Sequence, residues 1–162
     1  MKKILITLAL LISTKAYPSS CELCETYPYF SLGLGPAPIP VPNFSLGYRK
    51  QHIHNGYDIG VNLATAGIFT QARAYANWIH YFNPWIYNEA YFGLGASAGA
   101  WFVHSGKAFI AYPNILLGKS YYNRCGSKRF LQAEMNWPVY YSHRHELNWR
   151  FPLLTFSYGW GF

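Results

Sequence analysis

Large apolar residues alternate with small or polar residues along most of the chain, which is typical of β-strands with one apolar face. The alternation has no defect across 57–64, where the two faces carry Tyr57, Ile59, Val61 and Leu63 on one side and Asp58, Gly60, Asn62 and Ala64 on the other. The same two-residue period predicts further strands at 29–35, 44–50, 69–82, 88–101, 108–119, 131–137 and 154–162. The pattern therefore predicts an all-β chain of eight strands.

Turn residues separate these segments. Four prolines between 36 and 42 forbid ladder hydrogen bonds and predict a loop, and further turns are expected at 83–84, 104–107, 123–127 and 140–150. The Ala-rich text of 69–82 is also compatible with a helix, but the surrounding period of two favours a strand. Pro113 leaves the facing of the strand at 108–119 open.

The last nine residues place large apolar and small residues on opposite faces and stop on an aromatic residue. The large residues are Leu154, Phe156, Tyr158, Trp160 and Phe162. This ending resembles the assembly signal of bacterial outer-membrane β-barrels, whose final strand ends on Phe or Trp. The resemblance implies that Tyr158, Trp160 and Phe162 are read by the barrel-assembly machinery. The alternative is the last strand of a soluble barrel or sandwich, which would also alternate.

The N-terminus has the features of a secretory signal peptide. Lys2 and Lys3 precede an apolar run over 4–12, and Thr14 and Ala16 fit the small-residue positions before a cleavage site. Nine apolar residues are too few for a membrane-spanning helix, which needs about 20. The expected domains are therefore a signal peptide at 1–16, an irregular lead-in at 17–28 and a barrel at 29–162.

Composition favours a membrane barrel over a soluble domain. Aromatic residues make up 20% of the chain and charged residues only 12%, whereas soluble domains carry about 25% charged residues. A membrane barrel replaces surface charge by a lipid-facing apolar band with aromatic girdles. Removal of the signal peptide lowers the net charge from +7 to +4 and leaves no basic run that would indicate nucleic-acid binding.

These observations predict an eight-stranded antiparallel up-and-down transmembrane β-barrel in the outer membrane of a Gram-negative bacterium, exported through the Sec pathway. The resemblance extends to the small outer-membrane barrel families. Eight strands leave an interior filled by side chains, which disfavours porin activity. With both termini in the periplasm, the outward loops are expected at about 36–43, 65–68, 102–107 and 139–150, and the last is the expected contact surface.

Polar side chains on the small-residue faces predict a paired network inside the barrel. Its charged members are Arg49, Asp58, Arg73, Glu89 and Glu134. Further inward-facing polar residues are expected at Asn62, Gln71, Asn77, Gln132 and Asn136. A catalytic acid/base pair would use the same residue types, but a structural network is the favoured interpretation.

No catalytic, cofactor or metal site is predicted. The histidine pairs His52/His54 and His143/His145 fall in expected loops and have no third ligand at a recognisable spacing. Small outer-membrane lipid A deacylases use a His-x-Ser-Asn element, and the most similar text here, His52 to Asn55, has a histidine in place of the nucleophilic serine. His104 and Ser105 are adjacent and would point to opposite faces of a strand.

Three cysteines remain in a chain predicted to be exposed to the oxidising periplasm. Cys21 or Cys24 is expected to pair with Cys125, or the three leave a thiol for crosslinking to another envelope protein. A redox role for Cys21-x-x-Cys24 is not expected, because such motifs act at a helix start in a βαβ unit.

The predicted function is a non-enzymatic envelope component with a structural or adhesion-like role, and its expected partners are outer-membrane lipid and the barrel-assembly machinery. Two alternatives are a lipid-modifying barrel enzyme and a soluble periplasmic barrel that binds an apolar ligand. The soluble barrel requires an apolar interior and a polar exterior, the reverse of the facing expected for Asp58 and Glu134.

Overall fold

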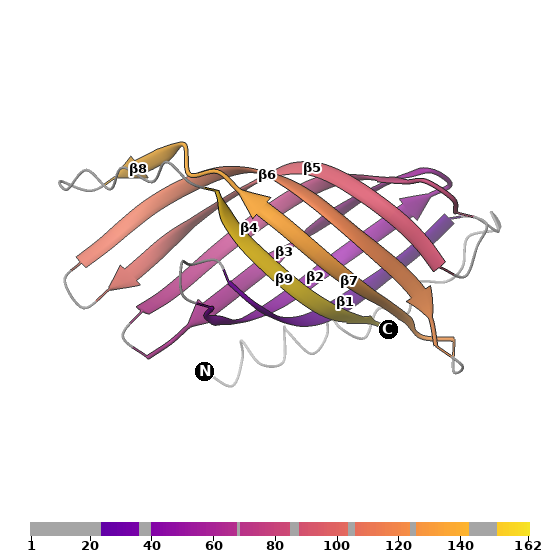
Figure 1. Ribbon diagram of the computed structural model, residues 1–162, viewed down its shortest axis with the longest axis horizontal. Coiled ribbons are helices and arrows are strands. Elements are labelled where there is room, and N and C mark those ends of the chain that lie inside the picture. The colour runs from indigo at the N-terminus through magenta and orange to yellow at the C-terminus, as the bar shows by residue number, and fades with distance from the viewer. Residues whose placement is uncertain are drawn as a thin grey trace, which may run out of the picture.

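The computed structural model describes residues 24–35, 40–67, 69–84, 88–103, 106–123, 126–142 and 152–162. They form nine strands (Figure 1): β1 Cys24–Leu34, β2 Pro42–His52, β3 Asn55–Thr65, β4 Phe69–Tyr81, β5 Asn88–Val103, β6 Gly106–Tyr122, β7 Lys128–Asn136, β8 Tyr140–Ser142 and β9 Leu153–Gly161. All eight predicted strands are present, and the Ala-rich segment at 69–82 forms β4 rather than a helix.

The eight long strands close into one antiparallel barrel. Their order is β5-β4-β3-β2-β1-β9-β7-β6, and β6 pairs again with β5. A row of paired residues that starts at Cys24 passes once around the barrel and returns to β1 at Leu34, ten residues further along. This offset corresponds to a strand tilt of about 40°. The predicted eight-stranded antiparallel barrel is therefore confirmed.

The short strand β8 continues β7 along the same neighbour. The backbone N–H groups of Trp137 and Val139 donate to Pro113 and Ala111 of β6, each at 3.0 Å, and residues 140–142 then pair with β6. Two residues that have no backbone N–H lie at this break: Pro138, and Pro113 of β6, whose carbonyl accepts from Trp137. Residues 140–142 of the expected loop at 139–150 are thus strand residues, and β8 lies at the left end of the barrel in Figure 1.

The expected irregular lead-in at 17–28 is wrong for its last five residues, since β1 begins at Cys24. Pro28 is tolerated there because it lies just beyond the last residue pair of β1 and β9, Tyr29 and Gly161. Its carbonyl accepts a hydrogen bond from the N–H of Phe162 at 3.1 Å, so the missing N–H faces the end of that ladder. Residues 17–23 lie outside the described residues.

Side chains alternate strictly between the interior and the outer face, even through Pro113. On β6 the residues Ala108, Ile110, Tyr112 and Asn114 are buried, while Phe109 and Leu117 are exposed to 63% and 59%. The outer face of the barrel is therefore apolar over its central part. Buried positions include many polar and charged residues.

Inward-facing glycines make room for large rings on neighbouring strands. A Cβ atom on Gly159 would come within 2.1 Å of the Phe130 ring, and one on Gly118 within 2.3 Å of the Tyr91 ring. Both rings are almost completely buried. Because close-packed interiors tolerate little added volume, these glycines fix where the aromatic rings lie.

Replacing Gly159 with alanine is expected to destabilise the barrel by about 1–3 kcal/mol, because the ring of Phe130 cannot move away from its neighbours. Denaturant unfolding of the refolded protein measures this loss. In a double-mutant cycle, Phe130→Leu should remove most of the penalty of Gly159→Ala. Additive effects of the two substitutions would contradict the proposed contact.

Candidate functional site

The barrel interior contains the five charged residues that the sequence singled out. They come from five different strands: Arg49 from β2, Asp58 from β3, Arg73 from β4, Glu89 from β5 and Glu134 from β7. Each is less than 9% exposed. The structure brings them into three groups along the barrel rather than into one network.

The central group surrounds Arg49, which is completely buried. Its Nη2 donates to Asp58 Oδ2 at 2.9 Å and to Gln132 Oε1 at 2.8 Å, and its Nη1 donates to the Tyr91 hydroxyl at 3.1 Å. The guanidinium also lies 4.4 Å from the centre of the Phe130 ring. Hydrogen bonds and aromatic faces together replace the water that this cation loses on burial.

Asp58 is also completely buried and has a second partner. The hydroxyl of Tyr29 donates to Asp58 Oδ1 at 2.7 Å. Tyr29 in turn shares a hydrogen bond with the hydroxyl of Tyr75. Both carboxylate oxygens of Asp58 are thus satisfied within the protein.

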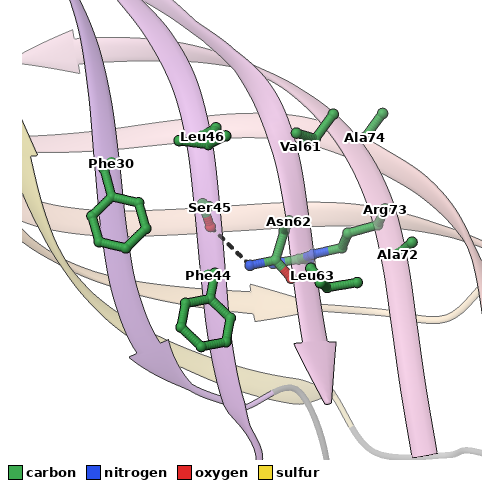
Figure 2. Close-up of a pocket in the computed structure, with 10 residues that line it drawn as sticks. All are labelled: Phe30, Phe44, Ser45, Leu46, Val61, Asn62, Leu63, Ala72, Arg73 and Ala74. Carbon is green, nitrogen blue, oxygen red and sulfur yellow. Dashed lines mark hydrogen bonds between the residues drawn. The ribbon is translucent and has the colours of Figure 1, made fainter. Parts of the chain in front are cut away.

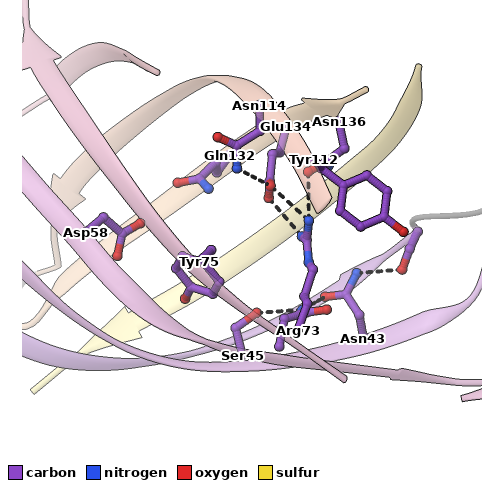
Figure 3. A network of polar contacts seen from close by, with 12 residues as sticks. Asn43, Ser45, Asp58, Arg73, Tyr75, Tyr112, Asn114, Gln132, Glu134 and Asn136 are labelled. Carbon is purple, nitrogen blue, oxygen red and sulfur yellow. Dashed lines mark hydrogen bonds and ion pairs between the residues drawn. The ribbon is translucent and has the colours of Figure 1, made fainter. Parts of the chain in front are cut away.

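A second group, nearer to β8, is built on a two-pronged ion pair (Figure 3). Arg73 Nη1 and Nη2 lie 3.0 Å from Glu134 Oε1 and Oε2 respectively. Arg73 Nη1 also donates to Asn136 Oδ1 at 2.7 Å, and Asn114 Nδ2 donates to Glu134 Oε1 at 2.9 Å. This fork geometry is the strongest form of an Arg–carboxylate contact.

The third group, at the end that carries the C-terminus, is centred on Lys128. Its Nζ lies 3.1 Å from Glu89 Oε2 and 2.8 Å from Gln51 Oε1, and it also contacts Glu25. The sequence prediction included Glu89 but missed both Lys128 and Glu25. Lys128 precedes the predicted strand at 131–137, and Glu25 precedes the predicted strand at 29–35. No alternation was therefore available to assign the face of either residue.

The other residues with candidate chemistry lie apart from this interior. His52 faces outward at the end of β2, and His54 lies in the following turn, where its Nδ1 is 3.0 Å from the carbonyl of Tyr81. The described residues contain no group of three His, Cys, Asp or Glu side chains that could hold a metal ion. Cys24 begins β1, whereas Cys21, Cys125, the pair His104-Ser105 and the pair His143/His145 lie outside the described residues.

Such an interior can hold the wall of the barrel together, because each cation bridges strands that are far apart in sequence. Arg49 and Gln132 are 83 residues apart, and Arg73 and Glu134 are 61 residues apart. The acid and base groups that could act in catalysis are engaged in ion pairs and shielded by side chains. A soluble barrel for an apolar ligand requires the opposite distribution of polar and apolar residues to the one seen here.

The fold and its two faces define a class: a closed eight-stranded antiparallel barrel with an apolar outer face and a paired polar interior. This fold is shared with solved structures, of which two are compared with the chain. The N-terminal β-barrel domain of Pseudomonas aeruginosa OprF aligns over 85% of this chain and 97% of its own length, with a TM-score of 0.58 and 11% identity. Neisserial surface protein A (NspA) aligns over 84% of this chain and 92% of its own length, with a TM-score of 0.55 and 13% identity.

The resemblance to the small outer-membrane barrels is confirmed at the level of the fold. No protein-family model matches the sequence, and no curated protein is similar to it in sequence. Within the described residues, no helix is long and apolar enough to span a membrane.

Breaking one interior ion pair is expected to cost more than removing it completely. Glu134→Gln leaves the Arg73 guanidinium buried without a counter-charge, which should destabilise the barrel by roughly 3–5 kcal/mol. The double variant Arg73→Met/Glu134→Leu removes both charges and should lose less. Denaturant unfolding curves of the three proteins test this order, and a double variant less stable than Glu134→Gln would contradict it.

Proposed function

We propose that this chain is an integral β-barrel of the outer membrane of a Gram-negative bacterium, where it has a non-enzymatic role in envelope structure or in contacts at the cell surface. Its partners are then outer-membrane lipid and the barrel-assembly machinery. The proposal depends chiefly on one feature of β6.

The outward-facing residues of β6 form an apolar stretch whose length matches the thickness of a membrane. Its outward-facing cations, Lys107 and Lys119, are twelve positions apart. At about 3.3 Å per residue and a tilt of about 40°, they are separated by about 30 Å along the barrel axis. This equals the thickness of the hydrocarbon core of a bilayer, about 30 Å. Every outward-facing residue between them is apolar: Phe109, Ala111, Pro113, Ile115 and Leu117.

The other strands continue the same apolar belt around the barrel. Outward-facing residues exposed to more than a third include Leu34, Leu46, Val61, Leu94, Leu131 and Phe156. Over β1 to β4 the outward-facing side chains, among them Phe30, Phe44 and Leu63, line an open apolar groove of about 520 Å³. The polar residues Ser45, Asn62 and Arg73 lie behind it (Figure 2). Exposed apolar surface on all sides is costly in water and is satisfied by lipid.

The interior supports a structural role. The carboxylates of Asp58 and Glu134, which could serve as acid or base, are held in ion pairs. Eight-stranded barrels are filled by side chains and leave no wide channel. Contacts at the cell surface then belong to the outward loops, of which residues 36–39, 68, 104–105 and 143–150 lie outside the described residues.

The C-terminal strand supports recognition of Tyr158, Trp160 and Phe162 during assembly. Trp160 stacks on Phe30 with ring centres 6.0 Å apart, while the side chain of Phe162 is 71% exposed at the end of β9. An exposed terminal aromatic beside the closing strand pair is accessible to an assembly factor. Export through the Sec pathway with loss of residues 1–16, and crosslinking through Cys21, Cys24 or Cys125, belong to the same proposal.

Removal of Phe162 is expected to reduce assembly in cells, whereas Phe162→Trp should preserve it. The readout is fractionation of expressing cells together with gel mobility of unheated and boiled samples. Wild type and Phe162→Trp should sediment with outer membranes and migrate as a compact form until boiled. Wild-type protein that is freely soluble in the periplasm and shows no heat-dependent shift would overturn the proposal.

The energetic cost of a charge placed in the middle of the outer face distinguishes a lipid-facing wall from a water-facing one. Ile115 is 42% exposed and lies between the two lysines of β6. In a bilayer, Ile115→Arg should destabilise the barrel by about 2–4 kcal/mol, while a water-facing position would tolerate it. Unfolding in lipid vesicles measures the cost, and Lys119→Arg at the edge of the belt serves as the matched control with little expected effect.

A further inference from the structure

Side-chain carboxylates and cations are distributed differently over the two faces of the described barrel. The four side-chain carboxylates, Glu25, Asp58, Glu89 and Glu134, lie on the interior face and each forms an ion pair. The outward-facing Lys and Arg residues of the same part of the chain are Lys50, Lys107, Lys119 and Arg129. Among the described residues, Lys50, Lys107 and Lys119 therefore have no side-chain carboxylate on their own face of the barrel.

Three of these cations lie at one level of the barrel, although they belong to strands on different sides. Each row of paired residues rises toward the β8 end by about 3 Å from one strand to the next. Successive residues of one strand are about 2.5 Å apart along the barrel axis. When this rise is taken into account, four residues lie within about 3 Å of one level along the barrel axis: Lys50 on β2, Lys119 on β6, Arg129 on β7 and His80 on β4. We call these four residues the basic ring.

Aromatic side chains form a band directly above the basic ring, on the side toward β8. Tyr57 is the cross-strand partner of both Lys50 and Trp78. The ring of His80 stacks on that of Trp78 with centres 5.8 Å apart. Arg129 Nη1 donates to the Tyr158 hydroxyl at 3.3 Å. Aromatic residues of this kind mark the boundary between hydrocarbon and headgroups in membrane proteins.

The position of the basic ring along the barrel axis indicates which surroundings its cations contact. Lys119 marks one end of the 30 Å apolar span of β6, so the ring lies at the level where phospholipid phosphates begin. The lysine stems can follow the apolar wall while the ammonium groups reach the interface. Because β2 and β6 lie four strands apart, on opposite sides of the barrel, a single soluble partner cannot contact the whole ring, whereas surrounding lipid can.

We infer that the basic ring binds the phosphate groups of anionic phospholipids in the leaflet that surrounds the C-terminal end of the barrel. This inference rests on the proposed membrane location and adds a lipid class and a leaflet to it. The attraction expected for Lys or Arg near an anionic surface corresponds to about a fivefold gain in affinity for each cation. Within the described part of the chain, Lys107 is the one outward-facing Lys or Arg at the other end of the belt, and it provides the matched comparison.

The test is lipid selectivity of the full chain in phosphatidylcholine bilayers. Brominated phosphatidylglycerol and brominated phosphatidylcholine are compared as quenchers of tryptophan fluorescence, since Trp78 and Trp160 lie beside the ring. Wild type should prefer the anionic lipid, Lys119→Gln should lower the preference about fivefold, and Lys107→Gln should lower it less than twofold. The triple variant Lys50→Gln/Lys119→Gln/Arg129→Gln should abolish it.

All variants should show the wild-type heat-dependent gel shift in pure phosphatidylcholine, because the substituted side chains lie on the outer wall. A triple variant that keeps the lipid preference, or equal effects of Lys107→Gln and Lys119→Gln, would overturn the inference. Loss of the preference on adding inorganic phosphate, but not on adding chloride at equal ionic strength, would show a site for free phosphate instead. Wild type that fails to insert into any bilayer would refute the proposed membrane location itself.

Discussion

Closure of the sheet between β1 and β9 is the constraint on which the rest of the molecule depends. An open sheet would leave two rows of unpaired N–H and C=O groups, which neither hydrocarbon nor a packed interior can satisfy. Closure pairs them and creates two chemically separate faces, because side chains alternate strictly between inside and outside. The ten-residue offset at this seam then sets the tilt of the strands and the level that each residue reaches.

Within the closed wall, β7 connects the three interior charge groups. This nine-residue strand contributes Lys128 to one group, Gln132 to the next and Glu134 with Asn136 to the third. The partners lie on β1, β2, β4 and β5, so contacts from one short strand reach across the barrel. Hydrogen bonds and ion pairs of this kind depend on orientation, whereas apolar packing does not. They therefore favour one arrangement of the side chains over competing arrangements.

The strands and their facing could be predicted from the sequence because both follow from a period of two. The alternation at 57–64 and the inward assignment of Arg49 or Asp58 needed no knowledge of neighbours. Pairing inside the barrel was out of reach, since which carboxylate meets Arg73 depends on the offset at the β1–β9 seam. Lys128 and Glu25 were missed because strand ends give too few residues to define a face, and β8 was missed because Pro138 interrupts the pattern.

The position of the described carboxylates in the interior determines the charge of the outer face. Ion pairs inside the barrel engage the described carboxylates with Arg49, Arg73 and Lys128, because a buried cation without a counter-charge is strongly destabilising. Among the described residues, outward-facing cations such as Lys50 and Lys119 are thereby left without a side-chain carboxylate on their own face. In the proposed membrane location, lipid headgroups at the edge of an apolar belt about 30 Å tall would supply their counter-charge.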